Sequence, residues 1–375
     1  MQSKTPPRNS RRNAIKALIA AGAAAIAAPY IITSRKSAPS RKMTTESADQ
    51  IVIRTSGGKS HYAYTEILFE PFRKETGIKV IGIPSNVEPV AEIKTMVDTG
   101  EYKWNMACLG NRAIPVLGQQ GYLEAHRLGN DDVVKTIMPH LLSDYSVGMN
   151  VYSIVLAYRT DAFKGRPTPK TWKDFWDVER FPGRRGLRQI PFDTIEEALL
   201  ADGVLPTEIY PCKLERAFDS LDRIKPHISV WWQNTPHAEQ LLKTGEVDLM
   251  PAFIISTLSA IDAGAPVAFS WDQHIYGYDN WTILKGTPNV DACRQFIRFA
   301  TDPERQARLI PYGISPTQPS ALEKDVLERN RIDPKYVKSL STYPDNLKKG
   351  IPSSGLYWAD KHSAIIERFS QWMVS

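Results

Sequence analysis

The stretch that decides the fold is Gln50–Ile83, which reads QIVIRTSGGKSHYAYTEILFEPFRKETGIKVIGI. Gln50–Ser56 contains three consecutive β-branched residues and is predicted to be a buried strand. Glycines interrupt it, Tyr62–Thr76 has the apolar spacing of a helix that ends at Gly77, and Lys79–Ile83 is predicted to be a second strand. A strand, a helix and a strand in this order predict two parallel strands joined by a crossover helix.

The same alternation continues along the chain of 375 residues. Further helices are predicted at Glu88–Thr99, Thr171–Val178, Thr194–Ala201, Lys213–Lys225, Thr235–Thr244, Ser256–Ala263, Asp291–Ala300, Pro303–Leu309 and Trp358–Met373. Further strands are predicted at Trp104–Leu109, Val151–Tyr158, Gly186–Ile190, Val230–Trp232, Val247–Ala252, Val267–Trp271 and Trp281–Leu284. This alternation predicts an α/β fold, a parallel sheet with helices on both faces, and the length predicts two lobes.

Residues 1–38 have the pattern of a twin-arginine signal peptide. Arg11 and Arg12 lie in a basic segment, and the Ala-rich run Ala17–Thr33 is uncharged. We expect a cleaved signal that takes the protein through the twin-arginine export machinery to the periplasm. An uncleaved anchor is the alternative, because this run of 17 residues is at the lower limit of the roughly 17–25 that span a membrane. Three positions are compatible with cleavage, after Ala27, Thr33 or Ala38.

The formal net charge of +6 suggests a nucleic-acid or membrane partner at first sight. Seven basic residues and no acidic ones lie in the signal, namely Lys4, Arg8, Arg11, Arg12, Lys16, Arg35 and Lys36. Without these seven the formal charge is −1. We therefore expect no nucleic-acid partner.

The sequence contains no recognisable catalytic or metal-binding motif. Its three cysteines are scattered, and none of its seven histidines has a metal-ligand spacing such as HExxH. Gly58-Lys59-Ser60 follows a strand and precedes a helix, but Ile53 stands where a phosphate loop requires glycine. We expect a protein that is not an enzyme and that has no bound metal and no cofactor.

One acidic residue lies among aromatic residues. Tyr276, Tyr278 and Trp281 surround Asp279 and Asn280 in a segment with little periodicity. An organic ammonium ion is attracted both by a carboxylate and by aromatic faces, the latter by about 0.5–2 kcal/mol per ring. Asp279 is therefore a candidate for binding an amine.

Short motifs spread over nearly the whole chain after the signal resemble those of a known family. In order they are Glu70–Phe72, Glu75–Val80, Tyr152-Ser153, Leu156–Tyr158, Phe181–Arg185, Ala217-Phe218, Leu221–Pro226, Trp231-Trp232, Gly245–Val247, Ala260–Gly264, Trp281, Lys285-Gly286, Pro288-Asn289, Tyr312-Gly313, Tyr357–Asp360 and Arg368-Phe369. Together they resemble the bacterial extracellular solute-binding proteins of ABC importers, in the branch of putrescine and spermidine receptors.

The resemblance implies a two-lobed periplasmic-binding-protein fold, type II-like, with a ligand cleft between the lobes. Lobe 1 is expected to comprise 48–153 plus 279–318, and lobe 2 to comprise 154–278 plus 319–375. A monomer is expected to capture a small polar solute and deliver it to an ABC permease in the inner membrane. A receptor for a membrane sensor and a periplasmic enzyme on the same scaffold are the alternatives.

The resemblance also implies the residues of the cleft. Asp279 matches the family carboxylate that holds a ligand amine. Glu196 lies near a second family carboxylate, with Glu197 or Asp193 as alternatives. The remaining expected ligand-binding residues are the aromatic walls Trp232 and Trp281, the hydrogen-bonding Ser56, Asn111, Tyr152 and Ser256, and Phe253.

Two departures from the polyamine receptors leave the ligand open. Their first loop carries Trp or an acid where this chain has Gly57–Lys59, and their Trp-x-Gly-acid segment is the uncharged Phe253–Ser256 here. A polyamine-like amine is the favoured ligand. A diamine, however, would find one or two carboxylates rather than several, and an unpaired buried ammonium costs several kcal/mol. Lys59 and Arg112 favour a carboxylate or sulfonate, so a mono-cation, an amino-acid-like zwitterion and a small organic anion are the alternatives.

Overall fold

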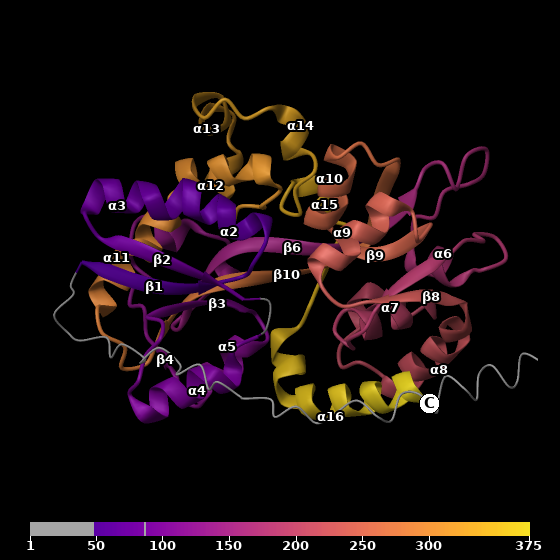
Figure 1. Ribbon diagram of the computed structural model, residues 1–375, viewed down its shortest axis with the longest axis horizontal. Coiled ribbons are helices and arrows are strands. Elements are labelled where there is room, and N and C mark those ends of the chain that lie inside the picture. Colours follow the sequence, from indigo (N-terminus) through magenta and orange to yellow (C-terminus); the bar gives the residue numbers. More distant parts are fainter. Residues whose placement is uncertain (1–48, 86–87) are drawn as a thin grey trace, which may run out of the picture. The chain divides into compact units, whose positions relative to one another are not determined.

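The computed structural model describes residues 49–85 and 88–375, so the predicted signal peptide lies outside the described residues. A mixed sheet runs through the fold in the order β2-β1-β3-β10-β6-β9-β7-β8 (Figure 1). These strands are β1 (Gln50–Thr55), β2 (Lys79–Pro84), β3 (Met106–Gly110), β6 (Ser146–Arg159), β7 (Arg185–Arg188), β8 (Ile228–Trp232), β9 (Leu249–Phe253) and β10 (Val267–Leu284). The short strands β4 (Leu123–Glu124), β5 (Leu142–Ser143) and β11 (Ile351–Pro352) pair with β10 or β6.

The first strand–helix–strand unit is confirmed. β1 pairs with β2 in parallel, and a continuous helical segment connects them through α2 (Lys59–Tyr64), a π-helical turn (Thr65–Phe69) and α3 (Glu70–Thr76). The segment begins three residues earlier than expected, directly after Gly58, whose φ of +71° is open to glycine without strain. It ends at Gly77 as predicted.

Helices cover both faces of this part of the sheet, as predicted. Ile51 and Ile53 of β1 pack with Phe72 on one face, whereas Val52 packs with Ile93 on the other, because successive strand residues point to opposite sides. The helices that follow α3 are α4 (Val90–Thr99), α5 (Ala113–Gln119), α6 (Trp172–Trp176), α7 (Thr194–Ala201), α8 (Leu214–Ile224), α9 (Thr235–Thr244), α10 (Ile254–Asp262), α11 (Val290–Ala300), α12 (Pro303–Leu309), α13 (Lys324–Arg329), α14 (Pro334–Val337), α15 (Pro344–Leu347) and α16 (Gly355–Val374). Figure 1 shows α4 and α5 on the opposite side of β1 and β3 from α2 and α3.

The prediction of a wholly parallel sheet was wrong at its centre. β1 is parallel to β2 and β3, and β7 is parallel to β8 and β9. In contrast, β10 is antiparallel to both β3 and β6, and β6 is antiparallel to β9. The two long antiparallel strands β6 and β10 thus join two groups of parallel strands, which gives a mixed sheet.

β10 also replaces two predicted strands. Val267–Trp271 and Trp281–Leu284 were expected to be separate, but they are the ends of one strand of 18 residues. The polar residues between them do not resemble a buried strand in the sequence. Their side chains are satisfied by backbone groups that lie far away along the chain. His274 bonds the carbonyl of Asn346 at 2.9 Å, and Asn280 donates to the carbonyl of Leu109 at 3.2 Å.

The buried apolar residues form two large clusters. The first apolar cluster takes its members from 51–151 and 281–314, and the second apolar cluster takes them from 154–275 and 351–369. This division follows the two lobes expected from the sequence, whose boundaries stay a prediction.

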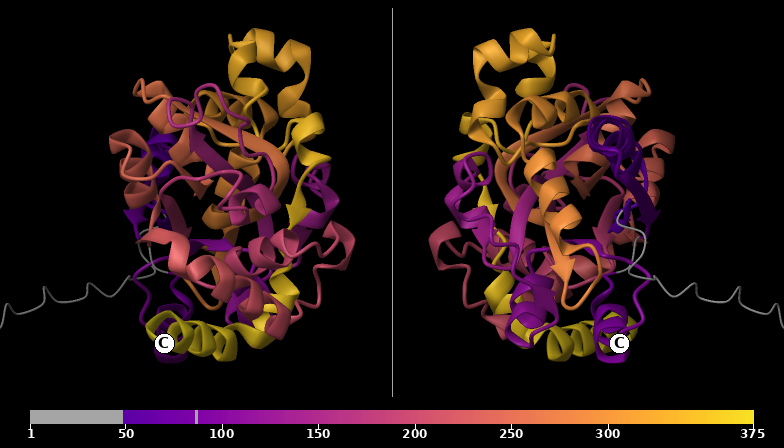
Figure 2. Two further views of the ribbon diagram at one scale, coloured as in Figure 1. Left: turned by 90° about the vertical axis from the view of Figure 1, so that its right-hand side faces the viewer. Right: turned by 90° about the vertical axis from the view of Figure 1, so that its left-hand side faces the viewer.

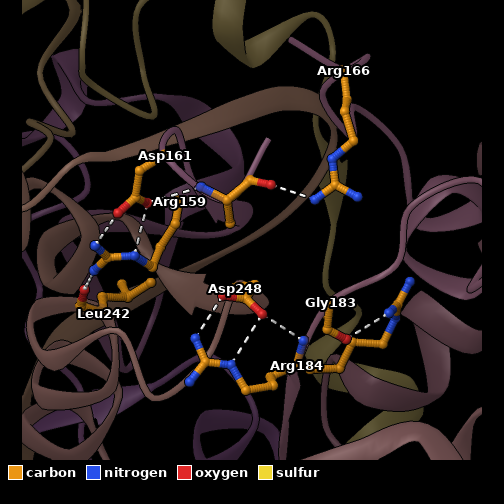
Figure 3. A network of polar contacts seen from close by, with 9 residues as sticks. Arg159, Asp161, Arg166, Gly183, Arg184, Leu242 and Asp248 are labelled. Carbon is orange, nitrogen blue, oxygen red and sulfur yellow. Dashed lines mark hydrogen bonds and ion pairs between the residues drawn. The ribbon is translucent and has the colours of Figure 1, made fainter. Parts of the chain in front are cut away.

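The Phe181–Arg185 motif holds β7 against β9 (Figure 3). Asp248 accepts two hydrogen bonds from the Arg184 guanidinium, at 2.8 and 3.1 Å, and one from its backbone N–H at 2.7 Å. Arg185 is buried and donates to the carbonyls of Gly183 and Phe175, at 3.0 and 2.9 Å. Burial lowers the pKa of Arg185 to about 10. The motif therefore has a structural task within the second apolar cluster.

The segment that leads into α16 contacts the residue that follows β3. Asn111 donates to the carbonyl of Ser353 at 2.9 Å, and Ser354 caps α16. Trp358 then enters the second cluster and donates its indole N–H to Glu196. In Figure 2, the end of α16 and the segment that carries α13 lie at opposite ends of the view.

Candidate functional site

A cavity of about 270 Å³ lies where β1, β3, β6, β9 and β10 meet the first residues of α2, α9 and α10. We call it the first chamber. Ligand sites in α/β proteins commonly lie at strand ends and helix starts. Its lining is Ser56–Ser60, Tyr64, Glu88, Gly110, Arg112, Asn150–Tyr152, Thr235, Pro236, Glu239, Phe253–Ile255, Ser259, Asp279, Gly313 and Ile314.

A second cavity of about 200 Å³ adjoins the first, and we call it the second chamber. The two chambers share Ser56, Glu88, Gly110, Thr235, Phe253 and Asp279, so these residues form a common wall. The second chamber adds Arg54, Ser85, Cys108, Arg188, Gln233 and Asn234.

The structure brings together only part of the predicted site. Ser56, Tyr152, Phe253 and Asp279 line the first chamber. The other expected residues, Asn111, Glu196, Trp232, Ser256 and Trp281, are buried elsewhere.

Asp279 is partly buried in the common wall and lies opposite Asn150 on the neighbouring strand. Asn150 donates to Asp279 Oδ2 at 3.2 Å and to the Tyr64 hydroxyl at 2.9 Å. Burial raises the pKa of the Asp279 carboxyl, against the lowering effects of Asn150, Arg112 and Arg54. The second oxygen, Oδ1, would lie 3.9 Å from a Cβ atom added at Gly110, as would Oε2 of Glu88. Two carboxylates thus converge over Gly110.

Cationic groups face the same chamber. The Arg112 guanidinium packs over the Phe192 ring at 4.4 Å, and within the described residues no hydrogen-bond partner reaches its buried Nη1 atom. Burial works to lower the pKa of Arg112, but Tyr152 and the nearby carboxylates raise it overall. Lys59 lies at the start of α2, 3.9 Å from Asp262. The first chamber therefore contains charges of both signs.

Arg188 supplies a fixed cation to the second chamber. Its Nη1 atom pairs with Asp193 at 2.9 Å, and its guanidinium lies 4.7 Å from the Phe253 ring and 5.2 Å from the Trp232 ring. Burial lowers the pKa of Arg188, although Asp193 opposes this.

Glu196 is engaged by protein donors inside the second apolar cluster. Its Oε1 atom accepts from the Tyr210 hydroxyl at 2.6 Å and from the Trp358 indole at 2.7 Å. Burial and the nearby Asp193 raise the pKa of Glu196 to about 7. The alternatives Glu197 and Asp193 are also buried and line neither chamber, although Asp193 pairs with Arg188 of the second chamber.

The two predicted aromatic walls are core residues. Trp281 packs against Tyr64 and Phe296, with ring centroids 5.7 and 5.2 Å apart. Trp232 packs against Phe253 at 6.0 Å, so it supports the residue that reaches the chamber. Ser256 likewise donates inward, to the carbonyl of Thr235 at 3.2 Å.

Sequence reasoning missed Asn150, Glu88 and Arg188. Asn150 had a usable signal, because it lies two residues before Tyr152 on one strand and must share its face. Arg188 lies in a predicted strand, where its charge was the only feature that distinguished it as a candidate site residue. Glu88 was expected as the first residue of a helix, and nothing nearby in the sequence distinguished it.

The described residues contain no cluster of three or more His, Cys, Asp or Glu that could hold a metal ion. Within 49–85 and 88–375, none of the helices combines the length and apolar character of a membrane span.

Comparison with known proteins identifies relatives over most of the chain. A gamma-aminobutyric acid (GABA)-binding protein of Pseudomonas aeruginosa is 31% identical over 87% of this chain and 91% of its own length. The spermidine/putrescine-binding periplasmic protein of Salmonella typhimurium is 25% identical over 76% of this chain and 82% of its own length. The crystal structure of an ABC transporter substrate-binding protein from Bradyrhizobium japonicum is 34% identical and superimposes with a TM-score of 0.80, covering 86% of this chain and 99% of that one.

The fold is accordingly that of the two-lobed periplasmic binding proteins. Residues 68–334 match the sequence profile of one family within that fold. This chain belongs to the bacterial extracellular solute-binding proteins.

Proposed function

We propose that this protein is the periplasmic receptor of an ABC importer and that it captures a small zwitterionic amino acid of the GABA type. The observation that carries the proposal is the presence of charges of both signs in the lining of one chamber, where Asp279 and Glu88 are acidic and Arg112 and Lys59 are basic. A zwitterion neutralises both sets at once.

The ammonium group of such a ligand fits beside Asp279. One oxygen of this carboxylate is held by Asn150, and the other lies near Gly110, where Oε2 of Glu88 converges with it. Tyr64 and Tyr152 add aromatic surface to the same chamber. Two carboxylates that converge in a partly buried wall destabilise each other, so an ammonium ion would be stabilised at this wall.

The carboxylate of the ligand fits the cationic side. Arg112 has a buried N–H group that no protein acceptor within the described residues uses. Guanidinium groups bind carboxylates with strong charge-assisted hydrogen bonds. Phe253, Ile254 and Ile255 supply apolar surface for the methylene groups between the two charges.

Capture of a polyamine is the second candidate, favoured by the two carboxylates that converge over Gly110. A diamine, however, would bring its second ammonium toward Arg112 and Lys59. The more similar GABA-binding relative, at 31% identity against 25%, also supports the zwitterion.

The remaining parts of the proposal follow from the family and the sequence. We infer export through the twin-arginine machinery, a monomer in the periplasm, and delivery of the ligand to an inner-membrane permease without chemical conversion. The lobe boundaries given above, at 153/154, 278/279 and 318/319, belong to the same proposal.

Thermal unfolding in the presence of GABA, putrescine, spermidine and small organic anions tests the proposal. A ligand at a hundredfold over its Kd stabilises the protein by about 2.7 kcal/mol. The expected result is that GABA raises the midpoint temperature of unfolding and that putrescine leaves it unchanged. A shift with polyamines alone would establish the second candidate, and a shift with anions alone would leave Asp279 without a ligand.

A further inference from the structure

A buried glycine of β10 lies beside the lining of the first chamber. Gly277 pairs with Tyr152 on β6, and the next pair along the same face of the two strands is Asp279 with Asn150. Tyr152, Asn150 and Asp279 all line the first chamber. The one position of these two pairs without a side chain is therefore the neighbour of the carboxylate proposed to hold the ligand ammonium.

The Tyr152 ring occupies the space that a side chain at position 277 would take. A Cβ atom added to Gly277 would lie 2.4 Å from the Tyr152 hydroxyl oxygen and 2.5 Å from Cζ, whereas ordinary van der Waals contacts of such an atom are 3.4–4 Å. The φ angle of Gly277 is outside the left-handed region, so its backbone conformation is open to other residues. The need for glycine here is steric, and it is imposed by one side chain.

The neighbours of Tyr152 restrict where a displaced ring could go. Along β6, Asn150 and Ile154 lie on the same face, and Ile154 is buried in the second apolar cluster. Toward β9, the Phe253 ring packs edge-on against Tyr152 with the ring centroids 5.8 Å apart. The direction away from the sheet leads into the first chamber, which Tyr152 lines. A residue larger than glycine at position 277 would thus move the ring into this chamber.

Tyr152 also lies within electrostatic reach of the cationic side of the chamber. Burial raises the pKa of Tyr152, against the lowering effect of Arg112, so the hydroxyl is neutral near pH 7. Tyr152 in turn acts to raise the pKa of Arg112, although burial of the guanidinium opposes this. A ligand that extends from Asp279 to Arg112 therefore places its methylene groups near the Tyr152 ring.

We propose that Gly277 determines the length of the amino acid that the first chamber accepts. The inference rests on the proposed function, because it takes the ammonium beside Asp279 and the carboxylate beside Arg112 as the two ends of the ligand. Glycine lets the Tyr152 ring lie over β10, which keeps space for the methylene groups between these ends. Gly277 acts through Tyr152 and is therefore a positioning residue.

Isothermal titration calorimetry with β-alanine, GABA and 5-aminovalerate tests the inference, because these probes differ only in the number of methylene groups. Gly277→Ala should weaken binding more for each added methylene group. We expect the ratio of affinities, 5-aminovalerate over β-alanine, to fall at least tenfold. An equal change for all three probes overturns the inference and leaves the proposed function intact. Binding of none of the three to the wild type overturns both.

A second variant separates displacement of the ring from disturbance of the sheet. Tyr152→Leu removes the atoms that a Cβ at position 277 would meet, so Gly277→Ala should change the same ratio less than twofold in that background. Tyr152→Leu alone should raise the ratio at least threefold. If Gly277→Ala does not fold, Tyr152→Leu decides, and an unchanged ratio overturns the inference.

Gly350→Ala is the matched control. A Cβ atom at Gly350 would lie 2.5 Å from the His274 ring and 2.7 Å from Tyr276, so this substitution also displaces side chains of β10. None of these three residues lines either chamber. The control should lower the free energy of unfolding in urea without changing the ratio of affinities. An equal change of the ratio in Gly350→Ala and Gly277→Ala, or an undiminished effect of Gly277→Ala beside Tyr152→Leu, overturns the role of Gly277.

Discussion

Asp279 and Glu196 were expected to do the same work, but the structure surrounds them differently. Asp279 lies in the wall of two chambers, and its Oδ1 atom lies near Gly110 together with Oε2 of Glu88. Glu196 lies inside an apolar cluster, where Tyr210 and Trp358 both donate to it. Each carboxylate has one oxygen that protein donors hold, and Oε2 of Glu196 is buried with no hydrogen-bond partner among the described residues. The difference shows that a carboxylate with an unused oxygen becomes a candidate ligand group only when it also lines a cavity.

Asp279→Asn should produce the largest effect. It removes the charge beside the ligand amine and should weaken GABA binding by about 2–4 kcal/mol, or roughly 30- to 1000-fold in Kd. Glu196→Gln is the matched control, because it makes the same chemical change at a carboxylate outside both chambers. Calorimetric titration of both variants with GABA measures the two affinities. An equal loss of affinity in both variants would contradict the contrast between Asp279 and Glu196.

The pH dependence of stability should distinguish Glu196 next. Its folded pKa of about 7 is above the ordinary 4.5, so the folded state binds the proton more tightly and stability from this group falls as pH rises between these values. Glutamine cannot titrate. The stability of the wild type relative to Glu196→Gln should therefore fall by up to about 3 kcal/mol over this range and stay level above it. Urea unfolding at several pH values measures this. A stability difference between the two proteins that does not change with pH would contradict the environment assigned to Glu196.

Trp358→Phe should cost somewhat less. It removes the indole donor to Glu196 and should destabilise the fold by about 1.5–3 kcal/mol at pH 8, where the acceptor is ionised. The loss should be smaller at pH 5. Trp176→Phe is the control, because that indole donates to the neutral carbonyl of Ser220 at 3.0 Å. A pH-independent loss at Trp358, like that expected for the control, would show that Glu196 is not charged at pH 8.

Lys59→Gln should give the smallest effect on stability, below about 0.5 kcal/mol, because its ion pair with Asp262 is exposed. Affinity for GABA should nevertheless fall severalfold if Lys59 assists the ligand carboxylate. Lys103→Gln breaks another exposed pair, with Glu92 at 2.8 Å, outside both chambers. Equal affinities of the two variants for GABA would remove Lys59 from the site.

The contrast between Asp279 and Glu196 also explains which site residues could be predicted from the sequence. Asp279 could be found because its signal is local, a carboxylate among aromatic residues one or two positions away. The partners of Glu196 are not local, since Trp358 lies 162 residues further along the chain. Sequence spacing identifies a buried acid but does not say which donors will meet it.

The fold could be predicted to a similar extent. The first parallel strands and most helices follow from periodicity within short windows. The sheet centre does not, because the polar residues of β10 are satisfied by the carbonyls of Leu109 and Asn346, which no local pattern reveals. Arg188 joins its site in the same way, through Asp193 and two rings from β8 and β9.

The irregular pairing of β10 has a mechanical consequence. Its pairing with β6 shifts at two places, between Ser270 and Ile275 and between Asp279 and Asn280. Such interruptions bend and twist a strand more than regular pairing does. β6 and β10 both contribute to the two apolar clusters, so any rotation of one cluster against the other must twist these two strands. Asp279 lies at one of the two shifts, so a solute that binds it contacts the strand at an irregular point of its pairing.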